Sequence, residues 1–218
     1  MTGETAKATQ GGKRGRKAAE TRRRILEAAG ELFVSRGYGA TTLQDIAALA
    51  GVAVQTVYFV FGNKRTVLKE LVDVTIAGDD EPVATMDRPW FRAAMDAPSA
   101  PEHLRLHVTG TRAVLDRVAP VTQVLATAVA TDPEVAALWP GDEDPRHLVQ
   151  SAAARSLMAK PGAREDVTPE HAADVLYGLL SPETYLLFVR DRGWEPGRWE
   201  RWAYETLSPQ LTRPPSQA

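Results

Sequence analysis

The sequence predicts an all-α protein with an N-terminal three-helix domain that contains a helix-turn-helix, followed by a C-terminal helical domain. Three observations predict this class. From Ala18 onward, apolar residues recur at spacings of three, four, seven and eight, as on one face of a helix. No segment alternates convincingly between apolar and polar residues with the period of two that marks a strand. Pro and Gly divide residues 89–207 into pieces of helical length.

Charge is distributed unevenly along the chain. The 218 residues carry a formal net charge of −2. Residues 1–78 hold 12 Lys and Arg against 7 Asp and Glu, whereas residues 79–218 hold 14 against 21. A basic N-terminal part followed by an acidic C-terminal part is typical of a polyanion-binding domain joined to a domain that does not bind polyanions.

The composition excludes several kinds of site. The chain has no cysteine, so disulfides, thiolate metal sites and cysteine nucleophiles are excluded. No apolar run approaches the roughly 18 residues of a membrane span, so no membrane partner is expected. The polar N-terminus lacks the apolar region of a secretion signal, and a cytoplasmic location is therefore expected.

The N-terminal residues predict an arm and then a helix. Residues 1–17 are small, polar and basic, as in a flexible arm able to reach a DNA minor groove. A helix is expected over 18–36, and Gly37 ends it because glycine readily adopts the left-handed conformation at a helix C-terminus. Its apolar stripe consists of Ile25, Ala28, Ala29, Leu32 and Phe33.

Residues 42–61 predict two short helices joined by a tight turn. Thr41 or Thr42 caps the first helix. Gly51 ends it, and the second helix covers residues 53–60. This arrangement is typical of a helix-turn-helix.

A further amphipathic helix is expected from Lys64 until the acidic run at 79–82, which marks a domain boundary. The first domain is therefore predicted over 18–78 and the second over 79–209. Residues 210–218 are rich in Pro and polar side chains and predict a flexible tail.

The second helix of the pair carries side chains suited to reading DNA. A recognition helix lies in the major groove and offers donors, acceptors and apolar contacts to base edges. With Val54, Val57 and Phe61 facing inward, the outward or rim residues are Gln55, Thr56, Tyr58 and Phe59. Gln can pair with adenine, Thr can pack on the thymine methyl group, Tyr can reach a phosphate, and Phe can only stack or make apolar contacts.

Phosphate contacts are expected where helix N-termini present free backbone N–H groups. Thr41, Thr42 and Lys64 occupy such positions, and Arg24 belongs to the basic front of the first helix. These four residues complete the predicted DNA-binding set.

Four sequence elements carry a family resemblance. They are ILxAAxxLF from Ile25, GYxATT from Gly37, DIAxxAGV from Asp45, and TVYxxFxxK from Thr56. Together they resemble the TetR/AcrR family of bacterial transcriptional regulators over residues 18–78. The resemblance implies an all-helical homodimer, usually a repressor. It also implies DNA contacts at Thr42, Gln55, Thr56, Tyr58 and Lys64.

Three positions depart from the family pattern. Ala53 stands where Ser or Thr often caps the recognition helix, Gln55 where Gly is common, and Val60 where His or Tyr is common. No Arg or Lys occurs from 53 to 60, so base readout is expected to be modest. Backbone contacts and the arm would then supply more of the affinity, with a steep salt dependence.

The second domain is expected to contain helices over 89–96, 101–117, 120–130, 133–139, 145–159, 168–190 and 196–207. Residues 168–207 resemble the C-terminal segment of one TetR subgroup through their LLSPE and RGW-P elements, which implies a dimer interface. This segment also has more apolar residues than one helix face needs for its own core, and a self-complementary patch at a two-fold interface is their simplest role. The predicted interface residues are Val175, Leu176, Leu179, Leu180, Leu186 and Leu187. The alternative is that they form the core of a single protomer. Pro182 is expected to kink or restart the helix.

Residues 86–160 are then expected to sense a ligand, which makes the second domain a ligand-binding and dimerisation domain. The predicted pocket residues are Trp90, Phe91, Met95, Leu104, His107, Thr111, Gln123, Trp139 and Met158. Ordinary core or surface is the alternative for each of them. The expected effector is an apolar or amphipathic small molecule, and neither a cofactor nor a metal is expected.

The predicted function is a ligand-responsive repressor that binds a pseudo-palindromic operator in double-stranded DNA as a homodimer and is released by a small molecule. The alternatives are an activator, and a regulator of the same fold that is controlled by a protein partner or works without a small ligand. An enzyme is not expected. The scattered histidines lack the acidic pattern of a zinc hydrolase, and no nucleophile elbow occurs.

Overall fold

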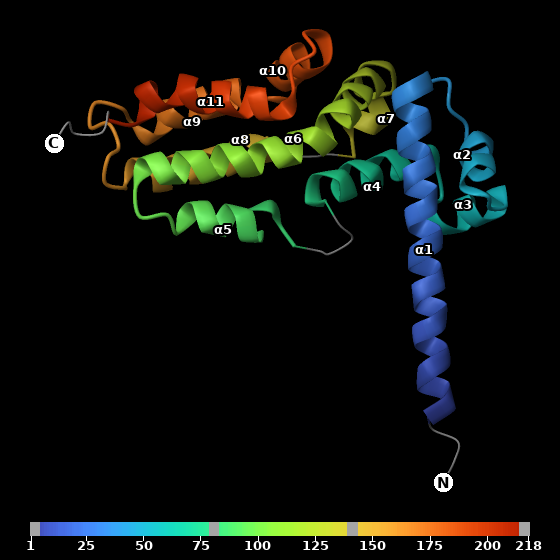
Figure 1. Ribbon diagram of the computed structural model, residues 1–218. Helices are drawn as coiled ribbons and strands as arrows, with labels where there is room; N and C mark the ends of the chain where they lie inside the picture. Colours follow the sequence, from blue (N-terminus) through green and yellow to red (C-terminus); the bar gives the residue numbers. More distant parts are fainter. Residues whose placement is uncertain (1–4, 79–82, 139–143, 214–218) are drawn as a thin grey trace. The chain divides into compact units, whose positions relative to one another are not determined.

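The structure is a computed structural model that describes residues 5–78, 83–138 and 144–213. Within these ranges the chain forms helices and no strand, which confirms the predicted all-α class (Figure 1). The chain divides into two compact units. Unit 1 comprises Met1–Asp73 and Gln123–Trp139, and unit 2 comprises Val74–Thr122 and Pro140–Ala218. The predicted boundary at residues 79–82 lies outside the described residues.

Unit 1 is built around the helix-turn-helix. Its helices are α1 (Thr5–Arg36), α2 (Leu43–Ala50), α3 (Val54–Phe61), the first part of α4 (Lys64–Ala77), the end of α6 (Ala100–Thr131) and α7 (Pro133–Ala136). The apolar stripe predicted from Ile25 to Phe33 is buried. It packs with the inward residues of the following helices, and Gly30 of α1 lies against Leu71 of α4.

Helix α1 is longer than the sequence predicted. It begins at Thr5 rather than near Ala18, so residues 5–17 are helical where a flexible arm was expected. That prediction missed the helix because the segment has no apolar stripe. Its Ala, Lys, Arg and Gln residues nonetheless have high helix propensity, which carries the helix through its glycines.

Residues 123–139 were predicted to belong to the second domain but cluster with unit 1. Polar contacts join them to α4. Arg65 of α4 donates from Nε to Asp132 Oδ2 at 2.9 Å and also pairs with Glu134 of α7.

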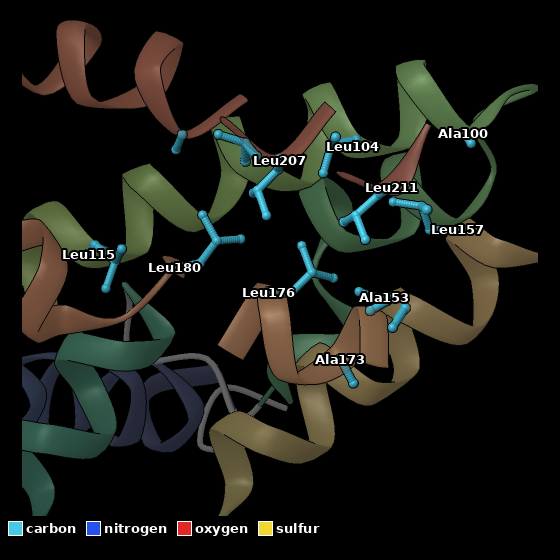
Figure 2. Close-up of a cluster of buried hydrophobic side chains, with 14 of the residues drawn as sticks. Ala100, Leu104, Leu115, Ala153, Leu157, Ala173, Leu176, Leu180, Leu207 and Leu211 are labelled. Atoms are coloured by element: carbon cyan, nitrogen blue, oxygen red, sulfur yellow. The ribbon is translucent and has the colours of Figure 1, made fainter. Parts of the chain in front are cut away.

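Unit 2 has a core made of several long helices. Its helices are α5 (Pro89–Met95), most of α6 (Ala100–Thr131), α8 (Pro145–Met158), α9 (Pro169–Leu179), α10 (Pro182–Leu186) and α11 (Pro196–Leu211), with a 3-10 turn at Thr85–Asp87 and a π-helical turn at Leu187–Asp191. Figure 2 shows side chains of this core, among them residues of α6, α8, α9 and α11. Among them are Leu104 of α6, Leu157 of α8, Leu176 of α9 and Leu207 of α11, all fully buried.

Helix α6 runs through Pro120, although two helices separated near that residue were predicted. The flanking Ala119 and Val121 are both buried, and their packing offsets the backbone hydrogen bond that Pro120 cannot donate. The helix is also long and apolar enough to span a membrane by those two measures alone, contrary to the sequence expectation. Core helices of soluble proteins meet the same measures, and α6 contributes Leu104, Val108 and Leu115 to the core of unit 2.

The C-terminal segment corrects another prediction. Pro182 restarts a helix as predicted, with Ser181 as its N-cap. Helix α11, however, continues through Pro209 to Leu211, although residues 210–218 were predicted to be flexible. Leu211 and Thr212 are buried, and Thr212 forms a backbone bridge to Ala163, so tertiary packing orders this end. Residues 214–218 lie outside the described residues.

Candidate functional site

The N-terminus of α2 is held by a reciprocal cap. The Thr42 hydroxyl accepts from the Asp45 N–H at 3.1 Å, and the Thr42 N–H donates to Asp45 Oδ2 at 2.9 Å. Hydrogen bonds from the hydroxyl and the N–H of Thr42 lower the pKa of the Asp45 carboxyl. Thr42 is exposed, so the capped end of α2 faces solvent.

The turn between α2 and α3 sets the angle between these two helices. The two helices are bent by 110° at this turn. Gly51 has a φ of 64°, in the left-handed region that favours glycine. The Arg24 guanidinium donates to the carbonyl of Ala50 and to that of Gly51, the latter at 3.4 Å. Arg24 was predicted to contact DNA, but in the structure it caps the C-terminus of α2, where carbonyls lack helical partners.

Helix α3 has an inward apolar face and an outward face, as predicted. Val57 is fully buried and Phe61 is 4% exposed. On the outward face, Tyr58 is 49% and Phe59 is 92% exposed, and Gln55 is exposed as well. Thr56 is half-buried at the rim, and Ala53 makes no side-chain cap to α3.

Two predicted phosphate contacts have other partners in the structure. Thr41 is 1% exposed, and its hydroxyl donates to the Gly37 carbonyl at 2.9 Å and to that of Leu32 at 3.3 Å. Lys64 Nζ donates to the Tyr38 carbonyl at 2.8 Å and the Thr41 carbonyl at 3.0 Å. Lys64 Nζ also lies 4.2 Å from the centre of the Tyr38 ring, and burial lowers the pKa of its ammonium. Both side chains therefore satisfy carbonyls around the end of α1.

The sequence did not predict the roles of two arginines that hold helices of unit 1 in place. Arg65 pairs with Asp132, whose pKa is lowered by the hydrogen bond from Arg65. Arg22 pairs with Glu70 and lies 5.1 Å from the centre of the Phe61 ring. No local pattern signals either pair, because the partners lie far apart in the chain.

Unit 2 contains a cavity of about 180 Å³. Its walls come from the end of α4, the 3-10 turn, α5, α6, α8 and the α9–α10 connection, and include Ile76, Thr85, Trp90, Thr111, Leu115 and Gln150. Trp90 and Thr111 were predicted pocket residues and do line it.

The other predicted pocket residues lie elsewhere. Phe91 and Leu104 are buried in the core, and Met95 and Met158 pack against it. Gln123 is exposed and belongs to unit 1, while Trp139 lies outside the described residues. Helical spacing places apolar residues on a buried face, but neighbouring helices decide whether that face meets a cavity or filled core.

A buried imidazole lies directly behind the cavity wall. His107 Nε2 is 2.8 Å from Oε1 of Gln150, and both residues are almost completely buried. His103 lies one turn earlier, and burial, together with His107 and Lys160, lowers its pKa to about 3. Burial also lowers the pKa of His107, so both rings are neutral. In the described ranges no three His, Cys, Asp or Glu residues gather as metal ligands.

Comparisons with known proteins match the helix-turn-helix and the fold. The family model "Bacterial regulatory proteins, tetR family" matches residues 25–71. The regulator TtgR of Pseudomonas putida is 48% identical over 56 residues, which cover 26% of this chain and 27% of TtgR. This chain thus spans about a quarter of that relative's length. TtgW of Pseudomonas putida, an uncharacterised regulator, is 36% identical over 91 residues, covering 39% of this chain and 68% of TtgW.

The chain belongs to the TetR family. A candidate transcriptional regulator from Saccharomonospora viridis, solved in complex with choline, superposes with a TM-score of 0.67 at 20% identity. The match covers 90% of this chain and 100% of that one, so the TetR-like fold extends through unit 2.

TetR-family regulators bind DNA as dimers, and the structure shows where the residues predicted for a dimer interface lie. Leu176 and Leu180 are fully buried in the core of unit 2, so their assignment to an interface is wrong. Their apolar spacing reflects packing within one protomer. Val175, Leu179 and Leu186 are partly buried against the same core, and Leu187 is 52% exposed. An interface at these four residues stays a prediction.

Proposed function

We propose that this TetR-family protein is a DNA-binding transcriptional regulator, a repressor that binds a pseudo-palindromic operator as a homodimer and is released by a small molecule. The outward face of α3 carries this proposal. Gln55, Tyr58 and Phe59 are exposed together on a helix whose inner face is fixed by buried Val57 and Phe61. Tyr58 and Phe59 place two adjacent aromatic side chains on this exposed face, and contiguous exposed apolar surface is typical of an interaction site.

The surroundings of α3 support a rigid presentation to the major groove. Gly51 and Arg24 hold the turn before it, and Lys64 anchors the helix that follows it. Rigid placement reduces the entropy lost on binding. The exposed cap at Thr42 leaves the N-terminus of α2 open to a phosphate, as expected of the first helix of such a motif.

The effector part of the proposal rests on the cavity and on α4. Helix α4 starts at Lys64, soon after α3 ends, and its residue Ile76 lines the cavity in unit 2. A ligand that displaces Ile76 acts on the helix that leads to α3. It shifts the population of the DNA-binding state only by its differential affinity for the two states.

The cavity favours a small-molecule effector over control by a protein partner alone, because a regulator without a small ligand is expected to have a C-terminal domain with a filled core. A cytoplasmic location is part of the proposal, because the DNA substrate of a bacterial regulator lies there.

Selection of bound sequences from random DNA duplexes tests the proposal. The wild-type protein is expected to enrich inverted repeats whose half-sites lie about one helical turn, ~34–36 Å, apart. Gln55→Ala is expected to lower affinity for the selected operator about tenfold and relax the preference for adenine at one position in each half-site. Tyr58→Ala is expected to weaken binding without changing the sequence preference, since a phosphate contact carries no base information.

Gln210→Ala on α11 is the matched control, because it removes the same exposed amide from unit 2. It is expected to leave both affinity and selected sequence unchanged. Unchanged binding by both α3 variants would show that α3 does not read the operator, and failure to enrich any sequence would remove the proposed function.

Phe59 is expected to read thymine methyl groups, because an exposed aromatic ring offers neither donor nor acceptor to a base edge. Replacing thymine with uracil, one position at a time in the selected operator, is expected to lower wild-type affinity about fourfold at the contacted position, the effect of about one buried methyl group. Phe59→Ala is expected to bind the thymine and uracil operators equally. A uracil effect that persists in Phe59→Ala would assign the methyl contact to another residue, with Thr56 the first to test.

A further inference from the structure

The cavity in unit 2 has a definite size. Its volume of about 180 Å³ slightly exceeds the roughly 150 Å³ of an apolar protein cavity that holds benzene. It therefore suits a molecule of about ten non-hydrogen atoms, such as one ring with a short substituent. Most of its wall is apolar and includes Val114, Val118, Val149 and Leu180.

Two polar side chains lie in this wall. Thr111 is 7% exposed and lines the cavity, where its hydroxyl can donate a hydrogen bond to a ligand. Gln150 is 2% exposed, and its Oε1 lies 2.8 Å from His107 Nε2. Because that oxygen can only accept, His107 Nε2 carries the proton, and the amide N–H groups of Gln150 remain as donors. A ligand oxygen that accepts from these two donors inside a largely apolar wall gains free energy.

The wall offers no free charge. Arg146 is the one charged side chain among the lining residues of the described chain. Its guanidinium donates to the Tyr177 carbonyl at 2.6 Å and lies 3.5 Å from the centre of the Tyr177 ring. The Tyr177 hydroxyl in turn donates to the Asp144 carboxylate at 2.5 Å, which places a negative charge beside Arg146. A charged ligand would lose its hydration without gaining an unpaired counter-charge.

We propose that this cavity binds an uncharged, largely apolar molecule of about ten non-hydrogen atoms with one oxygen acceptor, and that Gln150 and Thr111 donate to that oxygen. This effector class rests on the function proposed above. The apolar walls supply affinity, and the two donors select molecules that carry the oxygen over hydrocarbons of the same shape.

Calorimetric titration of the full-length protein, without DNA, tests the proposal with three probes. Propiophenone has the expected size and one carbonyl oxygen, propylbenzene replaces that carbonyl with a methylene group, and phenylacetate carries a negative charge. Propiophenone is expected to bind once per protomer, about thirtyfold more tightly than propylbenzene, which is the effect of two ordinary hydrogen bonds. Phenylacetate is expected to bind more than tenfold more weakly than propiophenone.

Three variants and one control locate the site and the donors. Gln150→Leu and Thr111→Val are each expected to bind propiophenone more weakly and to keep the wild-type affinity for propylbenzene. Thr111→Val preserves shape and leaves His107 paired, so it stands as the test if Gln150→Leu fails to fold. Val118→Phe fills the cavity and is expected to abolish binding of both probes, whereas Thr127→Val, on the exposed end of α6, is expected to change neither affinity.

Equal affinity for propiophenone and propylbenzene in the wild type would overturn the assigned donors. Tightest binding of phenylacetate would overturn the uncharged class, and unchanged binding by Val118→Phe would place the site elsewhere. The titration contains no DNA, so it tests the ligand site separately from the proposed regulatory function. If the protein binds propiophenone but selects no DNA duplex, the inferred ligand site stands and the proposed regulatory function is wrong.

Discussion

Replacing Gly110 with alanine is expected to lower the free energy of unfolding of unit 2 by about 1–3 kcal/mol, the usual range for overpacking. The same change inside an ordinary helix is stabilising by about 1 kcal/mol. The difference comes from Trp90. A Cβ atom on Gly110 would lie 2.1 Å from Cε3 of the Trp90 ring, so the indole would have to leave its place in the cavity wall.

A double-mutant cycle isolates this clash. In a Trp90→Ala background, Gly110→Ala is expected to become neutral or stabilising, which gives a coupling energy of about 1–4 kcal/mol. The measurement is urea unfolding followed by circular dichroism. Gly178→Ala on α9 is the matched control, because a Cβ there meets nothing within 4 Å, and it is expected to stabilise in both backgrounds. Equal effects of Gly110→Ala in the two backgrounds would show that Trp90 does not determine the cost.

The helix-turn-helix was predictable because its signals are local. The Thr42 cap, the Gly51 turn and the alternation of Val57 with Tyr58 are all set by neighbours within a few residues. Phe59 illustrates the same point, because its outward position follows from helical spacing alone. The family resemblance added the expectation that this outward face meets DNA.

The roles of Arg24, Thr41 and Lys64 were not predictable in this way. Sequence position places each beside a helix end, which suggested phosphate contacts. The structure shows that the nearest acceptors are carbonyls of the protein itself, including those of Gly51 and Tyr38, 27 and 26 residues away. Unsatisfied carbonyls and DNA phosphates attract the same cations, so residue type alone does not distinguish them.

Several residues predicted for the cavity, and two predicted for the interface, were placed wrongly for a related reason. Leu104 and Leu180 have the same chemistry and similar helical spacing, yet only Leu180 lines the cavity. Leu176 was assigned to an interface and fills the core instead (Figure 2). Whether an apolar residue lines a cavity depends on how several helices pack against one another. These helices lie far apart in the sequence, so their packing produces no periodic pattern that could be read from it.

Replacing Lys64 with methionine is expected to lower the free energy of unfolding of unit 1 by about 3 kcal/mol. Methionine keeps much of the apolar stem but removes two hydrogen bonds from a charged donor, each worth about 1.5–3 kcal/mol. The carbonyls of Tyr38 and Thr41 then lose their partner where α4 begins, and binding of the selected operator is expected to weaken as α3 loses its anchor. Denaturant unfolding and operator titration measure the two effects.

The salt dependence of operator binding separates this positioning role from a direct phosphate contact. A lysine that neutralises a phosphate contributes about one unit to the slope of log K against log salt, and its loss reduces the slope by that amount without affecting stability. For Lys64→Met, lower stability with an unchanged slope is expected, because the ammonium is already paired with carbonyls. Lys69→Met on the same helix removes an exposed ammonium that pairs with Asp73, and both stability and slope are expected to stay near wild type. A reduced slope at full stability for Lys64→Met would instead mean that its ammonium leaves the carbonyls for the DNA backbone on binding.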